Sequence, residues 1–293
     1  MKVLVTGAKG QLGNDLVSLL EAAGFTVAAF SSGELDITDA PAVLEAVKKV
    51  KPGIIINPAA YTKVDLAEKE KERAYAVNAN GPENLALAAI EAGCAIVHVS
   101  TDFVFDGRSP VPCAEDFETN PLSVYGASKL AGENAVAAAT NEHVIVRTSW
   151  LYGVEGHNFV KTILRLASER EVLRIVYDQT GTPTWSADLA SAIVNICKSI
   201  EAGKKPWGTY HYSNEGVASW YDFAVAICEE AASTGTPLKC KRIEPILTVE
   251  YPLPAARPAY SVLNKAKIKK TFDIEIPHWR SSLSKMLREL KGR

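Results

Sequence analysis

The sequence predicts an α/β protein built on a doubly wound parallel sheet. In its first half, short apolar runs alternate with segments that carry apolar residues at helical spacing, which is the pattern of parallel strands joined by helices. A glycine-rich turn connects the first apolar run to the first helical segment, as in dinucleotide-binding folds. The expected strands are 3–6, 26–30, 53–57, 95–100 and 144–148, and the expected helices are 12–23, 41–50, 69–78, 82–92 and 123–139.

The first element carries the glycine pattern G-x-x-G-x-x-G. Gly7, Gly10 and Gly13 follow a β-branched run that ends at Thr6. Gly7 would allow a tight turn, Gly10 a close approach of the backbone to a pyrophosphate, and Gly13 close packing of helix on strand. The amino end of the helix would offer free N–H groups to the phosphates. The pattern therefore indicates a Rossmann-type site, although three glycines in a loop can also be ordinary turn chemistry.

The fourth strand ends in a hydroxyl residue, Thr101. The carboxyl edge of an open parallel sheet is where such folds bind ligands. A hydroxyl at this edge can hydrogen-bond a carbonyl group of a substrate. The alternative is a strand-end threonine that satisfies only its local backbone.

The last predicted helix of this half contains the pair Tyr125 and Lys129. Residues four apart on a helix lie on one face, so the phenol and the ammonium are expected one turn apart. A nearby cation favours the phenolate and lowers the phenol pKa toward the range useful for proton transfer. The pair predicts acid–base chemistry next to the nucleotide site.

Composition excludes several classes of protein. The formal net charge of −2 argues against a general nucleic-acid binder, which needs a basic surface. The five cysteines are odd in number and lack metal-ligand spacing, which predicts free thiols in a reducing cytosol. The chain starts directly in its first expected strand, without room for a signal peptide, and no apolar stretch could span a bilayer. We expect a cytoplasmic protein that binds neither nucleic acid nor membrane.

Further motifs extend along the chain. They are Asn57-Pro58-Ala59-Ala60-Tyr61-Thr62, Val64-Asp65, Val77-Asn78, Ser100-Thr101-Asp102, 147–153, 178–184 and Arg257-Pro258. With the glycine loop and the Tyr125/Lys129 pair, they resemble the extended branch of the short-chain dehydrogenase/reductase family over nearly the whole chain. The runs 100–107 and 178–184 point within it to reductases of dTDP-linked 4-keto sugars.

This resemblance implies a Rossmann-type doubly wound sheet with a smaller carboxyl-terminal substrate-binding lobe. Residues 1–150 would form the dinucleotide-binding domain, and residues 151–293 mainly the lobe, with an interleaved boundary. The implied reaction is NAD(P)H-dependent reduction of dTDP-6-deoxy-L-lyxo-4-hexulose to dTDP-L-rhamnose. Tyr125 would donate a proton to the alkoxide, Lys129 would hold the nicotinamide ribose and bias the tyrosine pKa, and Thr101 would hydrogen-bond the carbonyl.

The resemblance also assigns binding residues. Expected at the cofactor are Gly7, Gly10, Gln11, Leu12, Gly13, Ser31, Asp36, Ile37, Ala59, Ala60, Tyr61, Asn78, Tyr125 and Lys129. Expected at the sugar nucleotide are Val64, Asp65, Thr101, Asp102, Phe103, Trp150, Asn158 and Arg257. For several of them a structural role is an alternative. Asn78 could satisfy helix backbone, Trp150 could belong to the core, and Arg257 could form a surface ion pair. The segment with Asp36 and Ile37 could be a turn and helix cap, and Asp102 could merely cap a turn.

The second expected strand ends without an acid, at Ser31 and Ser32. A carboxylate at that point would bind the ribose hydroxyls of NAD and repel a 2′-phosphate. The two serines could instead hydrogen-bond a phosphate, and Lys9 could add charge. We expect NADPH as the cofactor, with NADH also accepted.

Other activities of similar proteins define the alternatives. A 4,6-dehydratase would carry a second acid after Thr101-Asp102, where this chain has Phe103. A nucleotide-sugar epimerase, another reductase of the same class and a non-catalytic regulatory subunit like that of methionine adenosyltransferase remain open. We predict a monomer or homodimer without a structural metal, Mg²⁺ being possible but not predicted, because the carboxyl-terminal segment 285–293 has Glu289 as its only acid.

Overall fold

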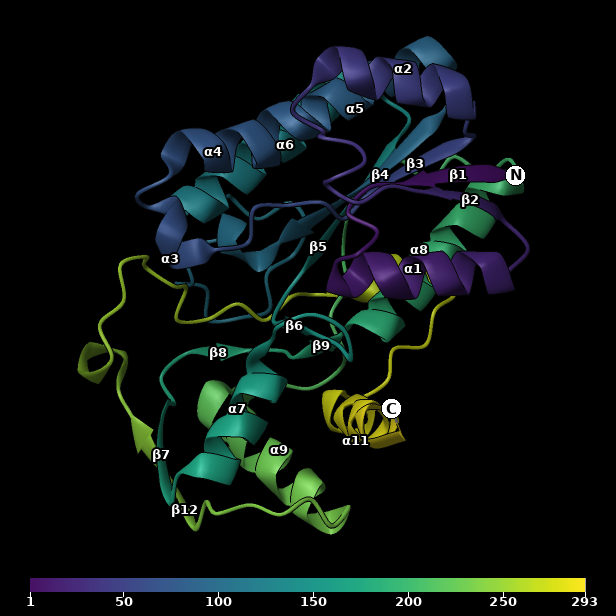
Figure 1. Cartoon of the computed structure of the whole chain (residues 1–293). Helices are drawn as coiled ribbons and strands as arrows, with labels where there is room; N and C mark the ends of the chain where they lie inside the picture. Colours follow the sequence, from purple (N-terminus) through teal and green to yellow (C-terminus); the bar gives the residue numbers. More distant parts are fainter. Residues whose placement is uncertain (293) are drawn as a thin grey trace.

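The computed structural model describes residues 1–292. Its centre is a six-stranded sheet in the order β10-β5-β4-β3-β1-β2, with every pair parallel (Figure 1). The strands are β1 (Lys2–Val5), β2 (Thr26–Ala29), β3 (Ile54–Asn57), β4 (Ala95–Thr101), β5 (His143–Thr148) and β10 (Gly208–His211). The first five match the expected strands to within two residues at each end. The predicted doubly wound parallel sheet is confirmed.

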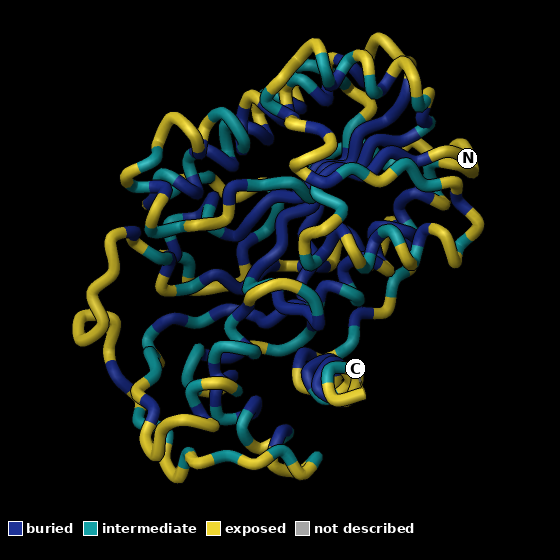
Figure 2. The backbone as a smooth tube through the Cα atoms, viewed as in Figure 1, coloured by how far each residue is buried: buried dark blue, intermediate teal, exposed yellow. Residues whose placement is uncertain are grey.

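Successive apolar side chains of the inner strands point to opposite faces of the sheet. Both faces are therefore apolar, and helices cover both. Val3 and Val5 of β1 pack on the side of α1 (Gln11–Ala22) and α8 (Ser186–Glu201). Leu4 points to the opposite side. There it meets the layer of α2 (Ala40–Val50), α5 (Gly81–Ala92) and α6 (Val124–Ala139). The inner strands β1, β3, β4 and β5 are mostly buried, and the outward helix faces are exposed (Figure 2), so the sheet is a rigid base for groups at its edge.

The second half forms a separate layer beyond the carboxyl edge of the sheet (Figure 1). Its helices α7 (Phe159–Glu169), α9 (Trp220–Ser233) and α11 (Trp279–Gly292) share one apolar core. Short pairs complete the layer: β6 (Leu151–Tyr152) with β9 (Thr184–Trp185), β8 (Thr180–Gly181) with β11 (Ala218–Ser219), and β7 (Val172–Val176) with β12 (Arg242–Ile246). The chain leaves the sheet after β5, then returns with α8 and β10. Helix α10 (Ala266–Phe272) packs beside β10, and the short turn η3 spans Thr248–Glu250.

One predicted helix differs from the structure. The sequence predicts one helix over 69–78 and a break before Pro82. The structure instead has two short helices, α3 (Val64–Ala67) and α4 (Lys71–Tyr75). A π-helical turn, η1 (Ala76–Asn80), then leads without a break into α5. The Gly81 N–H donates to the Ala76 carbonyl, five residues back. Pro82 lacks an N–H and would crowd the carbonyl four residues before it in a regular helix, so the wider turn accommodates the proline without ending the helix.

None of the described helices is long and apolar enough to cross a membrane.

Candidate active site

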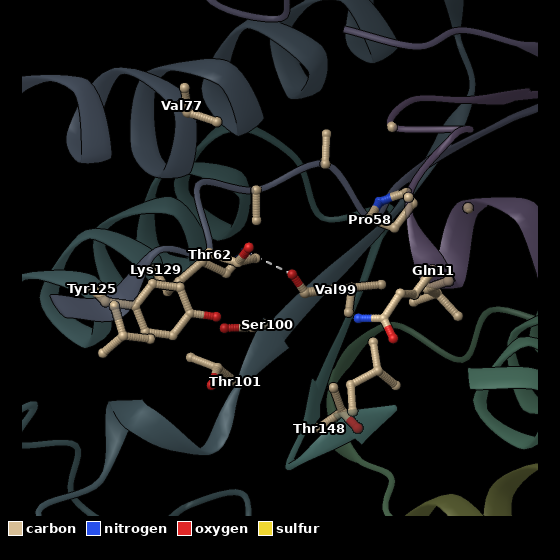
Figure 3. A pocket seen from close by; sticks show the side chains of 18 of the residues that line it. Gln11, Pro58, Thr62, Val77, Val99, Ser100, Thr101, Tyr125, Lys129 and Thr148 are labelled. Carbon is tan, nitrogen blue, oxygen red and sulfur yellow. Dashed lines mark hydrogen bonds between the residues drawn. The ribbon is translucent and has the colours of Figure 1, made fainter. Parts of the chain in front are cut away.

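A cavity of about 940 Å³ lies at the carboxyl edge of the sheet, between the glycine loop and the second-half layer (Figure 3). Eighteen of the predicted residues line it: Gly7, Gly10, Gln11, Leu12, Gly13, Ser31, Asp36, Ile37, Ala59, Ala60, Val64, Thr101, Asp102, Phe103, Tyr125, Lys129, Trp150 and Arg257. Tyr61, Asp65, Asn78 and Asn158 lie outside its wall. Residues from both halves of the chain therefore meet in one space.

The glycine loop forms one end of the cavity. Gly7 has φ +56°, a left-handed conformation that disfavours residues with a Cβ. A Cβ on Gly13 would lie 2.2 Å from the Gly7 carbonyl oxygen, so α1 can approach the loop only with glycine at this position. Helix α1 begins at Gln11, and the first N–H groups of a helix have no acceptor within it. These N–H groups make the loop suitable for an anionic group such as a pyrophosphate.

Tyr125 and Lys129 both lie on α6 and are buried. The Ser123 hydroxyl caps the helix by accepting from the Gly126 N–H. A Cβ on Gly126 would lie 2.2 Å from the Phe103 carbonyl oxygen, so the glycine lets α6 contact the turn η2 (Asp102–Val104). This contact places the Tyr125 ring edge-on to Phe103, with centroids 5.4 Å apart, beside the end of β4.

The electrostatics of Tyr125 differ from the sequence-based expectation. Burial raises the pKa of Tyr125 to about 12, the Thr101 hydroxyl opposes this rise, and the Asp102 carboxylate adds to it. Lys129 does not contribute to the pKa of Tyr125. Its Nζ instead donates to the Val99 carbonyl at 2.7 Å (Figure 3). The predicted lowering of the tyrosine pKa is thus wrong for this structure. The phenol stays protonated at neutral pH, as a proton donor in a reduction must.

Thr101 and Asp102 form the adjoining corner. The Thr101 hydroxyl donates to Asp102 Oδ1 at 3.0 Å and accepts from the Phe103 N–H at 3.2 Å. Asp102 is buried, and burial raises its pKa to about 6 against the opposing effects of Ser261 and Thr101. A carboxyl group with that pKa can be neutral or charged near neutral pH.

Asn78 hydrogen-bonds backbone groups, which is the structural role that the sequence analysis gave as the alternative to cofactor binding. It lies in the π-helical turn, and its side chain hydrogen-bonds both the N–H (2.8 Å) and the carbonyl (3.1 Å) of Tyr61. Its Nδ2 also donates to the Ser128 hydroxyl at 3.0 Å. The Tyr61 side chain points elsewhere, donating to Glu70. Asn78 thereby fixes the loop after β3 against α6, and the cavity-lining residues Ala59 and Ala60 lie on that loop.

Asp65 forms an ion pair with Arg257, which lines the cavity. The guanidinium contacts both carboxylate oxygens, at 3.0 and 2.7 Å, and the Ala255 N–H donates to the same carboxylate. The Arg257 side chain lowers the pKa of Asp65 by hydrogen bonding, and burial opposes this. The pair connects α3 of the first half to the loop that follows η3.

Trp150 lies where β5 leads into the second half. It has φ +48°, a conformation that costs a residue with a large side chain on the order of 1–3 kcal/mol. Its ring stacks on Trp220, with centroids 3.5 Å apart and planes 5° apart. The other tryptophan was not expected at the site, since it lies seventy residues later and no local motif marks it.

Asn158 connects the two halves of the chain. Its Oδ1 accepts from the Lys161 N–H at the start of α7, and its Nδ2 donates to the Gln11 side chain at 2.9 Å. Its Nδ2 also donates to the Gly153 carbonyl at 2.7 Å, so the side chain joins the start of α7 to the segment after β6 and to the first residue of α1. Further cavity-lining residues, to which the sequence analysis assigned no binding role, are Gly33, Leu35, Pro58, Thr62, Val77, Val99, Ser100, Thr148, Ser149 and Leu151.

Comparison with known proteins adds to this geometry. The sequence profile described as "RmlD substrate binding domain" matches residues 1–291.

This chain belongs to the RmlD substrate binding domain family.

Its similarity to members of the RmlD family extends over the full length. A dTDP-4-dehydrorhamnose reductase of Aggregatibacter actinomycetemcomitans is 44% identical, over 96% of this chain and 97% of the relative. A crystal structure of such a reductase from Clostridium acetobutylicum has a TM-score of 0.92 and 43% identity, over 99% of this chain and 100% of the other. The corresponding Bacillus anthracis structure, a complex with NADP, has a TM-score of 0.90 and 40% identity, over 98% and 99% of the two chains.

Three buried polar atoms at this edge have no hydrogen-bond partner: Ser100 Oγ, Asp102 Oδ2 and Thr148 Oγ1. Such atoms are costly to bury unless something completes their hydrogen bonding. All three belong to residues that line the cavity of this RmlD-family chain. Together with the glycine loop, they fit a polar nucleotide cofactor and a hydroxyl-rich substrate.

The end of β2 is more acidic than its sequence indicated. Glu34 lies three residues after Ser31, and its Oε2 accepts both the Ser31 N–H (2.8 Å) and the Ser31 hydroxyl (2.6 Å). These hydrogen bonds, with some help from Lys9, lower the pKa of Glu34. The Ser31 hydroxyl is therefore bonded to Glu34 in this structure. A carboxylate thus lies near the end of β2, where an acid in dinucleotide-binding folds favours the ribose hydroxyls of NAD over a 2′-phosphate.

We expect Glu34→Gln to lower the KM for NADPH relative to that for NADH, by roughly five-fold. The substitution removes a negative charge beside the 2′-phosphate position and weakens the hold on Ser31. Steady-state kinetics with both cofactors would measure this ratio. Glu45→Gln, at an exposed position of α2, is the matched control. An unchanged ratio in Glu34→Gln would show that Glu34 does not influence cofactor choice.

Within residues 1–292 no three His, Cys, Asp or Glu side chains come together as a metal site.

Proposed function

We propose that this chain reduces the 4-keto group of dTDP-6-deoxy-L-lyxo-4-hexulose to give dTDP-L-rhamnose, with NADPH as the preferred reductant and NADH also accepted. The observation that carries the proposal is the buried Tyr125 phenol beside Thr101 at the carboxyl edge of the sheet. Its raised pKa keeps a proton available where a carbonyl oxygen would become an alkoxide. The full-length similarity to dTDP-4-dehydrorhamnose reductases supports this substrate.

The cofactor would lie between the glycine loop and α6. The N–H groups of Gln11, Leu12 and Gly13 would bind the pyrophosphate. Asp36 and Ile37, which also line the cavity, would contact the adenine. When bound, NADPH supplies the hydride. Lys129, buried near the end of β4, would bind the ribose next to the ring that reacts.

The reacting carbonyl would lie between Thr101 and Tyr125. The Thr101 hydroxyl would turn its single hydrogen from Asp102 to the carbonyl oxygen and so orient the carbonyl group. The Tyr125 phenol donates its proton as negative charge develops on that oxygen, because an alkoxide is a far stronger base than a phenolate. Asp102, held next to Thr101, would accept from a neighbouring sugar hydroxyl.

The sugar nucleotide would enter from the second-half layer. Arg257 can exchange its hydrogen bonds with Asp65 for a diphosphate, whose geometry suits a guanidinium fork. Phe103, Val64 and Trp150 offer apolar surface beside it. In this proposal residues 1–150, completed by α8 and β10, bind the cofactor, and most of residues 151–293 bind the substrate. The five cysteines are free thiols, as in a reducing cytoplasm, and we propose a monomer or homodimer there.

The test is a turnover assay with the purified chain. Freshly prepared dTDP-6-deoxy-L-lyxo-4-hexulose is mixed with protein and NADPH, and loss of NADPH absorbance is followed together with formation of dTDP-L-rhamnose. We expect stoichiometric conversion. Cofactor binding without oxidation would overturn the proposal and favour a regulatory role, and conversion of the sugar without net NADPH loss would favour an epimerase.

A further inference from the structure

A chain of buried polar side chains runs behind the cavity, from β1 to α6. The Thr6 hydroxyl donates to Asn57 Oδ1 at 2.7 Å. Asn57 Nδ2 lies 3.2 Å from His98 Nδ1, and His98 Nε2 lies 3.3 Å from Lys129 Nζ. Thr6, Asn57, His98 and Lys129 are all buried. We call these four residues the buried polar chain.

The orientation of Asn57 is fixed by the backbone. Its Oδ1 also lies 3.2 Å from the Ala59 N–H, and an N–H can face only an acceptor. The amide nitrogen must therefore be the atom that faces His98. Because an amide NH₂ only donates, His98 Nδ1 must be an unprotonated acceptor.

His98 is uncharged in this setting. Burial, followed by the Lys129 charge, lowers the pKa of His98 well below its ordinary value, while the Asn57 backbone has a smaller opposite effect. A neutral imidazole with an unprotonated Nδ1 carries its hydrogen on Nε2. That N–H is directed at Lys129 Nζ.

An N–H donor stabilises only one protonation state of a lysine. The amine has a lone pair that can accept the hydrogen bond, whereas the ammonium has three hydrogens and no lone pair. The Val99 carbonyl, which accepts from Nζ at 2.7 Å, is compatible with both forms.

We infer that Asn57 and His98 are positioning residues that set the balance between the ammonium and amine forms of Lys129, by directing the His98 Nε2–H at its Nζ. This inference rests on the proposed role of Lys129 at the cofactor ribose and goes beyond it. Neither residue lines the cavity. His98 reaches it through Lys129, whereas Asn57 also holds the N–H of the lining residue Ala59.

The other charged groups around Lys129 do not replace this effect. Glu133, one turn along α6, favours the ammonium, but it is bound by a guanidinium fork from Arg147 of β5. Asp102, on η2, acts on Tyr125. The π-helical turn η1 contributes no charge near Lys129, because its buried polar residue, Asn78, is neutral. Burial lowers the pKa of Lys129 to about 8, in the same direction as the His98 N–H.

The decisive measurement is the tautomer of His98, read from the ¹⁵N shifts of its ring by NMR in the free protein. The chain has five histidines, and loss of one signal set in His98→Gln assigns the residue. We expect a neutral ring with the hydrogen on Nε2. A hydrogen on Nδ1, or an imidazolium at neutral pH, would overturn the inference. The measurement needs no turnover and is independent of the activity assay. A contradicting tautomer would leave the proposed reductase activity unaffected, and an absence of activity would leave the tautomer result unaffected.

Asn57→Asp is expected to reverse the tautomer of His98. A carboxylate keeps the acceptor for Thr6 and Ala59 but presents an acceptor to His98, so Nδ1 takes the hydrogen and Nε2 accepts from the Lys129 ammonium. We expect the ¹³Cε titration of Lys129 to move upward by about one pH unit or more. The alkaline limb of kcat/KM should move in the same direction. A folded Asn57→Asp protein with an unmoved Lys129 titration would contradict the inference.

Discussion

Replacement of Tyr125 by phenylalanine is expected to lower kcat for reduction of the keto sugar by about 10²–10⁴-fold. Only the hydroxyl is removed, because the phenylalanine ring can keep the edge-on contact with Phe103. The Tyr125 pKa of about 12 means that the wild-type phenol is protonated throughout the neutral range. The loss of rate should therefore show little pH dependence between pH 6 and roughly 8, and the variant should bind NADPH with unchanged affinity.

Steady-state kinetics and a cofactor titration on the same preparation would separate the two effects. Tyr75→Phe, at an exposed position of α4, is the matched control and should retain wild-type rates. A kcat within a few-fold of wild type in Tyr125→Phe would remove the phenol from the mechanism. A parallel loss of NADPH affinity would instead indicate a packing role.

Gly13→Ala is expected to weaken NADPH binding and to lower the Tm. The new Cβ would lie 2.2 Å from the Gly7 carbonyl oxygen and 2.8 Å from Ala8 Cα, both backbone atoms that cannot rotate away. Overpacking of this kind costs about 1–3 kcal/mol, more than the gain of up to about 1 kcal/mol from alanine in a helix. If the loop shifts to relieve the clash, the Kd for NADPH should rise by roughly 5–150-fold.

Calorimetric titration with NADPH and a thermal melt would measure both consequences. Gly33→Ala is a suitable control, because Gly33 also lines the cavity but a Cβ there would meet no atom within 4 Å. Its Kd and Tm should stay near those of the wild type. Equal behaviour of the two variants would show that the loop accommodates a Cβ at position 13 and that the close packing is not needed.

Much of the fold could be predicted because its signals are local. Short apolar runs between helical segments located β1 to β5, and Gly7, Gly10 and Gly13 located the turn before α1. The spacing of Tyr125 and Lys129 put both on α6 and at the cavity. Each of these features depends on residues that are close together in sequence, so a single sequence is enough to predict it.

The parts that could not be predicted depend on partners distant in sequence. Nothing near Trp150 indicates that Trp220 covers one face of its ring. The spacing of Tyr125 and Lys129 could not show that the lysine bonds the Val99 carbonyl rather than the phenol. Glu34 was missed for a different reason: it is close to Ser31 in sequence, but only the turn conformation brings its carboxylate back onto that serine.

The strand order has a consequence for how the protein is made. β5 is paired on one side by β4, and its other side is covered only by β10, which leaves the ribosome some sixty residues later. Until then a nascent chain presents a strand with free N–H and C=O groups, together with the apolar surface that α8 will bury. An open edge of this kind can pair with another chain, and a fragment ending near residue 150 would lack β10 and leave β5 at the edge of the sheet.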